Sequence, residues 1–130
     1  MEINWEKLRL QALQASKNAY APYSKFPVGA AAIVDDGRVV TGANVENASY
    51  GLTLCAECSL ISELFASGGG KLVAFCCVDA DGAVIMPCGR CRQLLSEHAA
   101  AGMMLETVSG IKSIEEVIPD AFGPSDLEES

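Results

Sequence analysis

Leu72-Val73-Ala74-Phe75-Cys76-Cys77-Val78 is an unbroken apolar run near the middle of this 130-residue chain. Gly68-Gly69-Gly70 precedes it and Asp79-Ala80-Asp81-Gly82 follows it, a pattern typical of a strand buried on both faces. Neighbouring strand residues point to opposite faces, so Cys76 and Cys77 do not easily bind one ion together. We interpret both thiols as core residues, because free cysteine packs like a small hydrophobic side chain.

Helices are predicted before and after this strand in the sequence. Thr53 is the expected cap of a helix that runs to about Ser67, and Cys88 opens another that continues through about Ala100. Asn4 is the expected cap of a first helix, in which apolar side chains recur at helical spacing. The residues of that pattern are Trp5, Leu8, Ala12, Ala15 and Ala19.

The remaining strands set the fold class. Val28 to Val34 and Val39 to Val45 are predicted to form a β-hairpin around Asp35-Asp36-Gly37-Arg38. Met103 to Thr107 is a further expected strand, and Ser113 to Ile118 a short helix. Strands alternating with helices indicate a layered α/β fold, and the antiparallel hairpin followed by parallel crossovers predicts a mixed sheet. The length fits one domain over residues 1–130.

Composition excludes several classes of partner. The net charge is −8, and from Ser113 onward there are six acids and no base. Because no basic cluster is present, we expect no nucleic acid polymer as a partner. No stretch approaches the roughly 20 apolar residues that cross a bilayer, so no membrane is expected. The N-terminus carries no signal-peptide pattern, which favours a cytoplasmic protein whose six cysteines are reduced.

Two cysteine motifs lie at the beginnings of predicted helices. They are Cys55-Ala56-Glu57 and Pro87-Cys88-Gly89-Arg90-Cys91. Helix N-termini favour thiolates, so Cys55, Cys88 and Cys91 could hold one metal ion between two helices. Structural zinc sites usually have four protein ligands, whereas catalytic sites have three and bind water in the fourth position. Three thiols beside a carboxylate therefore indicate a catalytic metal.

Two other interpretations stay open on spacing alone. Cys88 and Cys91 form a Cys-x-x-Cys pair that also occurs in thiol redox motifs, although this leaves Cys55 and Glu57 unexplained. Alternatively, Cys58 closes a structural zinc site with the other three thiols, making a non-catalytic zinc-binding module. A lone Glu early in a helix is commonly a partner of the helix dipole.

Both cysteine motifs together resemble the signature of the cytidine deaminase superfamily, in which His or Cys, then x-Glu, precedes Pro-Cys-x-x-Cys. Three further blocks resemble free-nucleoside cytidine deaminases, in the same order along the chain. They are residues 21–31 (APYSKFPVGAA), 44–50 (NVENASY) and 119–124 (PDAFGP). The resemblance implies a three-layer α/β/α fold with a mixed central sheet. The short length is similar to that of the homotetrameric branch.

The resemblance also implies the chemistry. Cys55, Cys88 and Cys91 would hold one Zn²⁺ per subunit, and Glu57 would transfer protons between water and the base. The product of cytidine or deoxycytidine is then uridine or deoxyuridine, with release of ammonia in pyrimidine salvage. The implied substrate contacts are Phe26, Asn44, Glu46, Tyr50, Ala56 and Phe122. Phe122 would come from a neighbouring subunit and Tyr50 would lie near the interface, as in a tetramer with shared active sites.

The sequence departs from many relatives directly after Glu57. They have an arginine that donates to the zinc thiolates, whereas this chain has Cys58. Arg90 between the paired cysteines, or Arg92 just after them, is expected to supply the missing positive charge. Within the superfamily, a cytosine nucleoside antibiotic or a nucleotide is an alternative substrate, although Glu46 would repel a phosphate.

Overall fold

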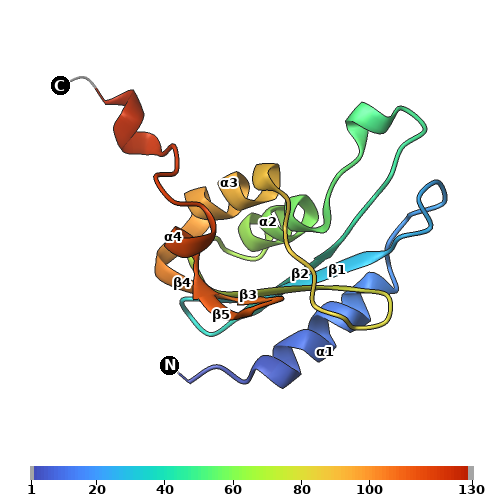
Figure 1. The fold of residues 1–130 in the computed structure, drawn as a ribbon, viewed down its shortest axis with the longest axis horizontal. Helices are drawn as coiled ribbons and strands as arrows, with labels where there is room; N and C mark the ends of the chain where they lie inside the picture. Colours follow the sequence, from blue (N-terminus) through green and yellow to red (C-terminus); the bar gives the residue numbers. More distant parts are fainter. Residues whose placement is uncertain (1, 129–130) are drawn as a thin grey trace.

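The computed structural model describes residues 2–128, which form one five-stranded sheet in the order β2-β1-β3-β4-β5 (Figure 1). The strands are β1 (Val28–Val34), β2 (Val39–Ala43), β3 (Leu72–Asp79), β4 (Ala99–Thr107) and β5 (Gly110–Ser113). β3 and β4 are parallel, and the other neighbouring strands pair antiparallel. The prediction of a mixed central sheet is confirmed.

Helices cover both faces of this sheet, which confirms the three-layer α/β/α architecture (Figure 1). One face is covered by α1 (Trp5–Ser16), and the other by α2 (Ala56–Ala66), α3 (Gly89–His98) and α4 (Ile114–Val117). Two 3-10 helices, η1 (Tyr50–Leu52) and η2 (Pro124–Leu127), lie outside these layers. Within residues 2–128, no helix has the length and apolar character needed to cross a membrane.

The N-terminal helix begins where the sequence predicts. The Asn4 side chain accepts a hydrogen bond from the Lys7 N–H at 3.0 Å, which is an N-cap. The helix packs closely on β1, because a Cβ atom at Gly29 would lie 1.9 Å from the Ala12 carbonyl oxygen. Leu8 and Ala12 of α1 are buried in one apolar cluster with Ala31, Ala74 and Cys76 of the sheet.

The second helix begins later than predicted. Its N-cap is Cys55, and the expected cap at Thr53 is wrong. The chain stays extended through Leu54 because Val45 and Leu54 exchange two backbone hydrogen bonds of 2.9 Å. The metal-binding motif therefore starts at the cap of α2 rather than inside its first turn.

The C-terminal third of the sheet is more extensive than predicted. α3 ends at His98 instead of about Ala100, and β4 begins directly at Ala99. β5, which the sequence did not predict, pairs with β4 through a tight hairpin that closes at Gly110, where φ is 111°. The short helix α4 follows, and its Ser113 cap forms a capping box with Glu116.

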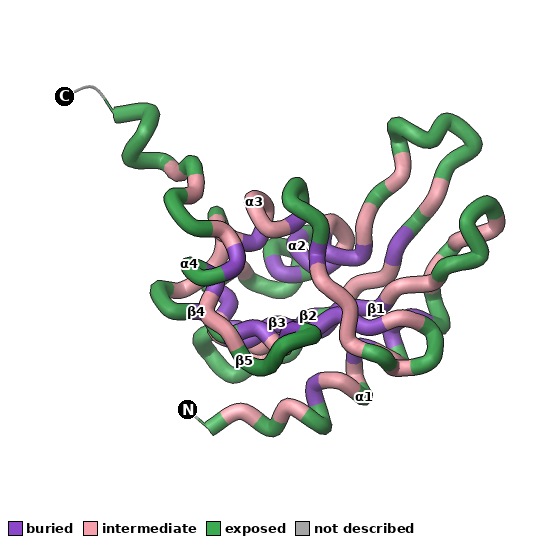
Figure 2. Tube along the Cα trace, in the orientation of Figure 1, coloured by how far each residue is buried: buried purple, intermediate pink, exposed green. Residues whose placement is uncertain are grey.

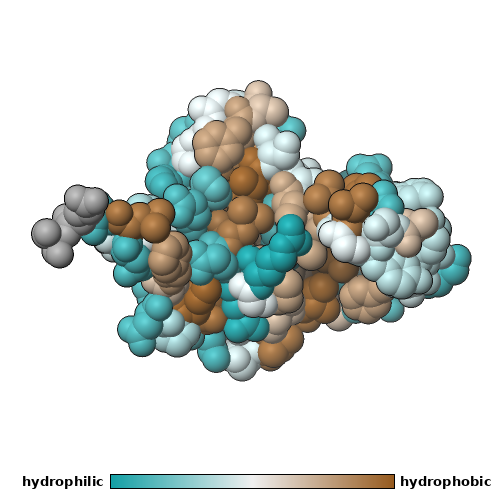
Figure 3. Space-filling model, turned by 90° about the horizontal axis from the view of Figure 1, so that it is seen from above, coloured by the Kyte–Doolittle hydropathy of each residue, from teal (hydrophilic) through white to brown (hydrophobic). Residues whose placement is uncertain are grey.

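Two segments extend away from the body of the molecule. One is the arm formed by residues 45–54 with η1, and the other is the C-terminal segment 119–128 with η2 (Figure 1). Both are mainly exposed, whereas the strands and α2 contain most of the buried residues (Figure 2). The face on the side of α2 and α3 carries apolar side chains beside polar ones (Figure 3). Exposed large apolar residues of the two segments are Val45, Tyr50, Leu52, Leu54, Phe122 and Leu127.

Candidate metal centre and adjoining pockets

Three thiols from two helix N-termini meet at one place. The sulfur atoms of Cys55, Cys88 and Cys91 all lie within 4.8 Å of one another. Cys55 is the N-cap of α2 and Cys88 the N-cap of α3, while Cys91 lies in the first turn of α3. The sheet brings these two helix starts together, because α2 precedes β3 and α3 follows it.

The environments of the three thiols differ. The backbone N–H groups of Cys91 and Arg90, free at the start of α3, lower the pKa of Cys88. Burial is the main reason that the pKa values of Cys55 and Cys91 are raised. Cys88 is exposed and Cys91 is buried, so the centre lies at the base of an opening and not on the surface.

This donor set fits Zn²⁺. Three thiolates around one tetrahedral zinc ion at about 2.3 Å lie roughly 3.8 Å apart, a separation compatible with a sulfur cluster within 4.8 Å. Among the described residues, the donors of the cluster are Cys55, Cys88 and Cys91, without Cys58. A structural site closed by Cys58 is therefore not favoured, and three ligands leave a position for water.

The two candidate arginines have different surroundings. The Arg92 guanidinium is engaged, because it donates to the Pro87 carbonyl at 2.8 Å and to the Val117 carbonyl at 3.1 Å. Arg90 instead lines a pocket with Cys58 and Cys91, and the nearby sulfur groups of Cys58 and Cys55 raise its pKa. Arg92 thus ties the metal motif to α4, while Arg90 is the cation beside the cluster.

Glu57 is a buried carboxylate in the first turn of α2, with 4% of its surface exposed. The described residues contain two ion pairs, Arg9–Glu106 and Arg38–Asp36, and neither involves Glu57. A carboxylate held this far from solvent without a cation is uncommon. Its position among the thiols indicates a chemical role.

The thiols and Glu57 line one small cavity of about 180 Å³. Asn44, Ala56 and Ile85 contribute to its wall, so two of the predicted substrate contacts lie beside the metal centre. The volume is below the 300–1,000 Å³ typical of sites for whole small molecules. Only part of a nucleoside-sized ligand fits there, and the rest must extend outward.

Asn44 holds one wall of this cavity through its side chain. Its Oδ1 accepts from the Val28 N–H at 2.9 Å, and its Nδ2 donates to the Phe26 carbonyl at 3.0 Å. These bonds fix the loop that precedes β1. An amide offers two donors and two lone pairs, so one donor and one lone pair remain for a ligand.

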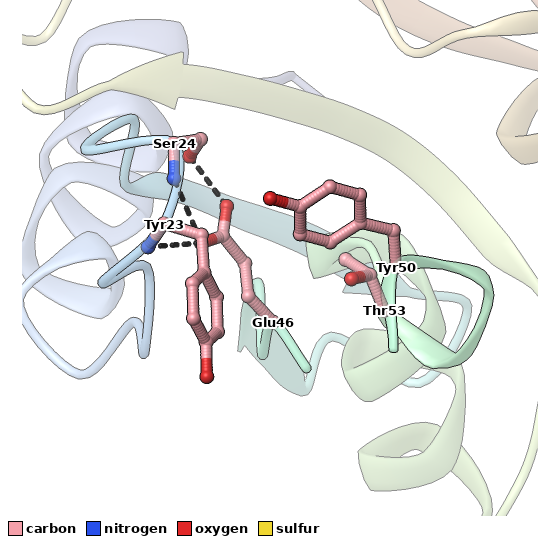
Figure 4. A pocket seen from close by; sticks show the side chains of 5 residues that line it. All are labelled: Tyr23, Ser24, Glu46, Tyr50 and Thr53. Atoms are coloured by element: carbon pink, nitrogen blue, oxygen red, sulfur yellow. Dashed lines mark hydrogen bonds between the residues drawn. The ribbon is translucent and has the colours of Figure 1, made fainter. Parts of the chain in front are cut away.

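A second, wider pocket of about 440 Å³ adjoins the first. Its lining consists of Tyr23, Ser24, Glu46, Tyr50 and Thr53 (Figure 4). Thr53 lines both pockets, so the two lie next to each other.

The Glu46 carboxylate faces the loop of Tyr23 and Ser24 across this pocket (Figure 4). It accepts from the backbone N–H groups of Tyr23 at 3.0 Å and Ser24 at 3.1 Å, and from the Ser24 hydroxyl. These bonds, led by the Ser24 hydroxyl, lower the pKa of Glu46. A carboxylate has about four acceptor sites, so one remains available to a ligand hydroxyl.

The three predicted aromatic contacts are exposed. Tyr50 is 74% exposed, and Phe26 and Phe122 are about half exposed. Phe26 directly follows Lys25, and Phe122 lies two residues after Asp120. Lys25 and Asp120 are the two non-glycine residues with positive φ in the described chain, at 61° and 53°. Phe122 lines neither pocket of its own chain. Its carbonyl accepts from the Gln93 side chain at 2.8 Å.

Comparison with known proteins agrees with this geometry. Residues 3–107 match the family model for the cytidine and deoxycytidylate deaminase zinc-binding region. The chain belongs to this deaminase family. The cytidine deaminase of Mycobacterium tuberculosis H37Rv is 55% identical over 126 residues, which cover 97% of this chain and 95% of the relative. The cytidine deaminase of Halalkalibacterium halodurans is 40% identical over 123 residues, which cover 90% of this chain and 92% of the relative.

Solved structures of the deaminase family have the same fold. A crystal structure of cytidine deaminase from Mycobacterium tuberculosis superimposes with a TM-score of 0.91 at 55% identity. The match covers 94% of this chain and 99% of that one. The crystal structure of cytidine deaminase from Mycobacterium leprae superimposes with a TM-score of 0.90 at 55% identity, and the match covers 92% of this chain and 100% of that one.

Three parts of this deaminase-family site were not predicted. Thr53 was expected to be a helix cap, yet it joins the two pockets. Tyr23 and Ser24 were assigned only to a loop, although they hold Glu46. Cys77 was assigned to the core, and its thiol also donates at 3.2 Å to the carbonyl of Ile85, which lines the smaller cavity. No spacing pattern marks such contacts, because they join residues far apart in the sequence.

Proposed function

We propose that this chain is a zinc-dependent hydrolase that converts free cytidine and deoxycytidine to uridine and deoxyuridine, with release of ammonia. One observation carries the proposal: the buried Glu57 carboxylate lines the same cavity as the three clustered thiols. Membership of a zinc-binding deaminase family supports the same activity.

The metal would be held by Cys55, Cys88 and Cys91, one ion per chain. When bound there, Zn²⁺ supplies Lewis-acid activation of a water molecule at neutral pH. Glu57 is then the proton carrier: it accepts a proton from water and delivers it to ring nitrogen 3 of the base. Attack at ring carbon 4 follows, and a second proton leaves with the amino group as ammonia.

The two adjoining pockets suit the two halves of a nucleoside. The smaller pocket, next to Glu57, would take the pyrimidine, with Ala56 in its wall and Phe26 over the base. The wider pocket would take the sugar, whose hydroxyls would bind Glu46 in that pocket and Asn44 in the wall of the smaller one. A phosphate on the sugar would lie near the Glu46 carboxylate, so charge repulsion supports a nucleoside substrate over a nucleotide.

Arg90 is proposed to balance the metal centre. Three thiolates and one Zn²⁺ carry a net charge of −1, which makes the loss of a proton from bound water harder. The guanidinium of Arg90 lies beside the sulfur atoms and is permanently charged. It would therefore perform the role of the arginine that many relatives have at the position of Cys58, while Arg92 supports the motif from α4.

A homotetramer with shared active sites is proposed on the placement of the aromatic residues. Phe122 is exposed on a segment outside its own pockets, and Tyr50 is exposed on the arm. A second copy of the chain could bring Phe122 over the base. Closed two-fold assemblies are the common way to share a site in this manner. The free thiols support a cytoplasmic location.

The test is an ultraviolet assay with purified protein. With cytidine or deoxycytidine, the absorbance of the cytosine base should fall, and one ammonia should be released per nucleoside converted. CMP should react far more slowly, and adenosine should not react. Removal of metal by a chelator should abolish the reaction, and added Zn²⁺ should restore it. Absence of ammonia from both nucleosides with one zinc bound per chain would contradict the proposal.

A further inference from the structure

The C-terminal segment 119–128 leaves the body of the molecule beside α3 and carries Phe122, which is 56% exposed (Figure 1). Among residues 2–128, one hydrogen bond joins this segment to the rest of the chain: the Gln93 side chain donates through Nε2 to the Phe122 carbonyl at 2.8 Å. The other hydrogen bonds of the segment join residues within the turn 123–128. Gln93 is therefore the polar contact that sets the position of the Phe122 backbone.

The residue before Gln93 holds the start of the same stretch. Arg92 donates to the Val117 carbonyl at 3.1 Å, at the end of α4. Neighbouring side chains of α3 thus hold both ends of residues 117–122. Between these ends, Asp120 has a positive φ of 53°. Such a conformation is unfavourable for a residue with a Cβ, so the turn depends on contacts with its surroundings.

The same helix carries two of the three clustered thiols. Cys88 is the N-cap of α3, and Cys91 lies in its first turn. Gln93 follows two residues later and lines a pocket together with Cys91. Phe122 lines neither of the two pockets proposed for the nucleoside in its own chain. One helix therefore connects the metal centre of a chain to a ring that the site of that chain does not use.

We propose that Gln93 is a positioning residue that directs Phe122 into the active site of a neighbouring subunit, which makes α3 a link between two active sites. This inference rests on the proposed function, in which Phe122 packs on the base bound by another copy of the chain. Without the Gln93 amide, the Phe122 carbonyl loses its donor and the segment can take other directions. Only a fraction of the sites then hold the ring correctly, and the apparent affinity for substrate falls by that fraction.

The first measurement uses Gln93→Met, which keeps the length of the side chain and removes its donor. We expect KM for cytidine to rise about three- to tenfold, the effect of one hydrogen bond. The value of kcat should be unchanged, because packing on the base contributes equally before and during the reaction. In a Phe122→Ala background, the same change should have no further effect. Gln14→Met is the control and should leave KM unchanged, because Gln14 is exposed on α1, on the opposite face of the sheet.

The second measurement asks which subunit's site Gln93 serves. Gln93→Met and Glu57→Gln are mixed after partial dissociation, and cytidine is kept well below KM. One hybrid site then combines Glu57 from the first variant with a correctly held Phe122 from the second, so the activity should exceed the sum of the separate activities. Phe122→Ala mixed with Glu57→Gln tests the shared site itself. Gln14→Met mixed with Glu57→Gln is the control and should give only the sum.

The outcomes separate this inference from the proposed function. If Phe122→Ala gains activity with Glu57→Gln but Gln93→Met gives only the sum, the role of Gln93 in the neighbouring site is overturned. Loss of zinc from Gln93→Met would overturn it as well, because Gln93 would then act on its own metal centre, and so would a KM effect that persists without Phe122. If neither mixture gains, the shared site of the proposed function fails and this inference falls with it.

Discussion

Glu57 is buried and has no ion-pair partner among residues 2–128, and this combination determines what a change there should do. Glu57→Gln keeps the shape of the side chain but cannot carry a proton. Loss of a general acid–base group commonly lowers the rate 10²–10⁴-fold, and here one group serves more than one transfer. We expect kcat for cytidine to fall at or beyond the upper end of that range, with one zinc still bound. A variant with more than a tenth of the wild-type rate would identify a different proton carrier.

Arg90 lines a pocket together with Cys58 and Cys91, so its positive charge should stabilise a metal bound to the thiolates. Removal of a group that supports metal ligands commonly weakens affinity or activity 10–100-fold. We therefore expect Arg90→Ala to lower zinc affinity in this range, measured by competition with a chromogenic chelator. Cys58→Arg added to this variant should restore part of the affinity.

Lys17→Ala is the control for the change in net charge, because Lys17 is exposed at the end of α1. The Arg90 proposal would be refuted by a variant that binds zinc as tightly as the control.

At the scale of single residues, the site was predictable where chemistry follows sequence spacing. Cys55, Cys88 and Cys91 were grouped by their motifs, and the structure brings their sulfur atoms together. Thr53 was misassigned because a hydroxyl before an apolar segment resembles a helix cap. The contact between the Cys77 thiol and the Ile85 carbonyl could not be predicted, since strand periodicity gives the face of a side chain and not its neighbours.

The element that positions Glu57 is held by a glycine and a serine. A Cβ atom at Gly42 of β2 would lie 2.3 Å from the Ala56 carbonyl oxygen. The Ser59 hydroxyl joins α2 to the same strand through the N–H and carbonyl of Ala43, at 2.9 and 3.0 Å. The first turn of α2 therefore lies against β2 with no space for a methyl group.

Gly42→Ala should displace this turn without touching any proposed ligand. Overpacking costs about 1–3 kcal/mol, so Tm should fall, and zinc should be lost more readily because Cys55 moves with the helix. Gly51→Ala is the matched control, since a Cβ at Gly51 has no atom within 4 Å. Thermal unfolding and zinc release should be measured for both. Similar behaviour of the two variants would mean that α2 is positioned by other contacts.

Among the elements, β3 was predicted to within one residue because a long apolar run has few alternatives. The C-terminal elements were less predictable. β4 begins at Ala99-Ala100-Ala101, which favours a helix as much as a strand, and only pairing with β3 makes it extended. β5 is short and half exposed, so it has no apolar pattern of its own.

For the whole molecule, the open question is whether one chain contains a complete site. If Phe122 acts in a neighbouring subunit, each active site takes Glu57 from one subunit and Phe122 from another. Glu57→Gln and Phe122→Ala then each remove the contribution of a different subunit. Each variant alone should have low activity. Mixed after partial dissociation, they should form hybrid interfaces in which one site has both intact residues, and activity should rise. In the control, Leu127→Ala is mixed with Glu57→Gln, and the activity after mixing should equal the sum of the separate activities. The same result for Phe122→Ala mixed with Glu57→Gln would contradict the shared site.

Lys25 adopts a left-handed backbone conformation directly before Phe26, and Asp120 adopts one two residues before Phe122. Such a conformation is unfavourable for residues with a Cβ, so each is held by its surroundings and helps to set the path of the chain into the aromatic residue. The rings are therefore ordered before a ligand arrives, and binding should lose little conformational entropy. Lys25→Gly would let the loop sample both positive and negative φ at this position. Calorimetry with uridine should then show a similar enthalpy of binding and a less favourable entropy.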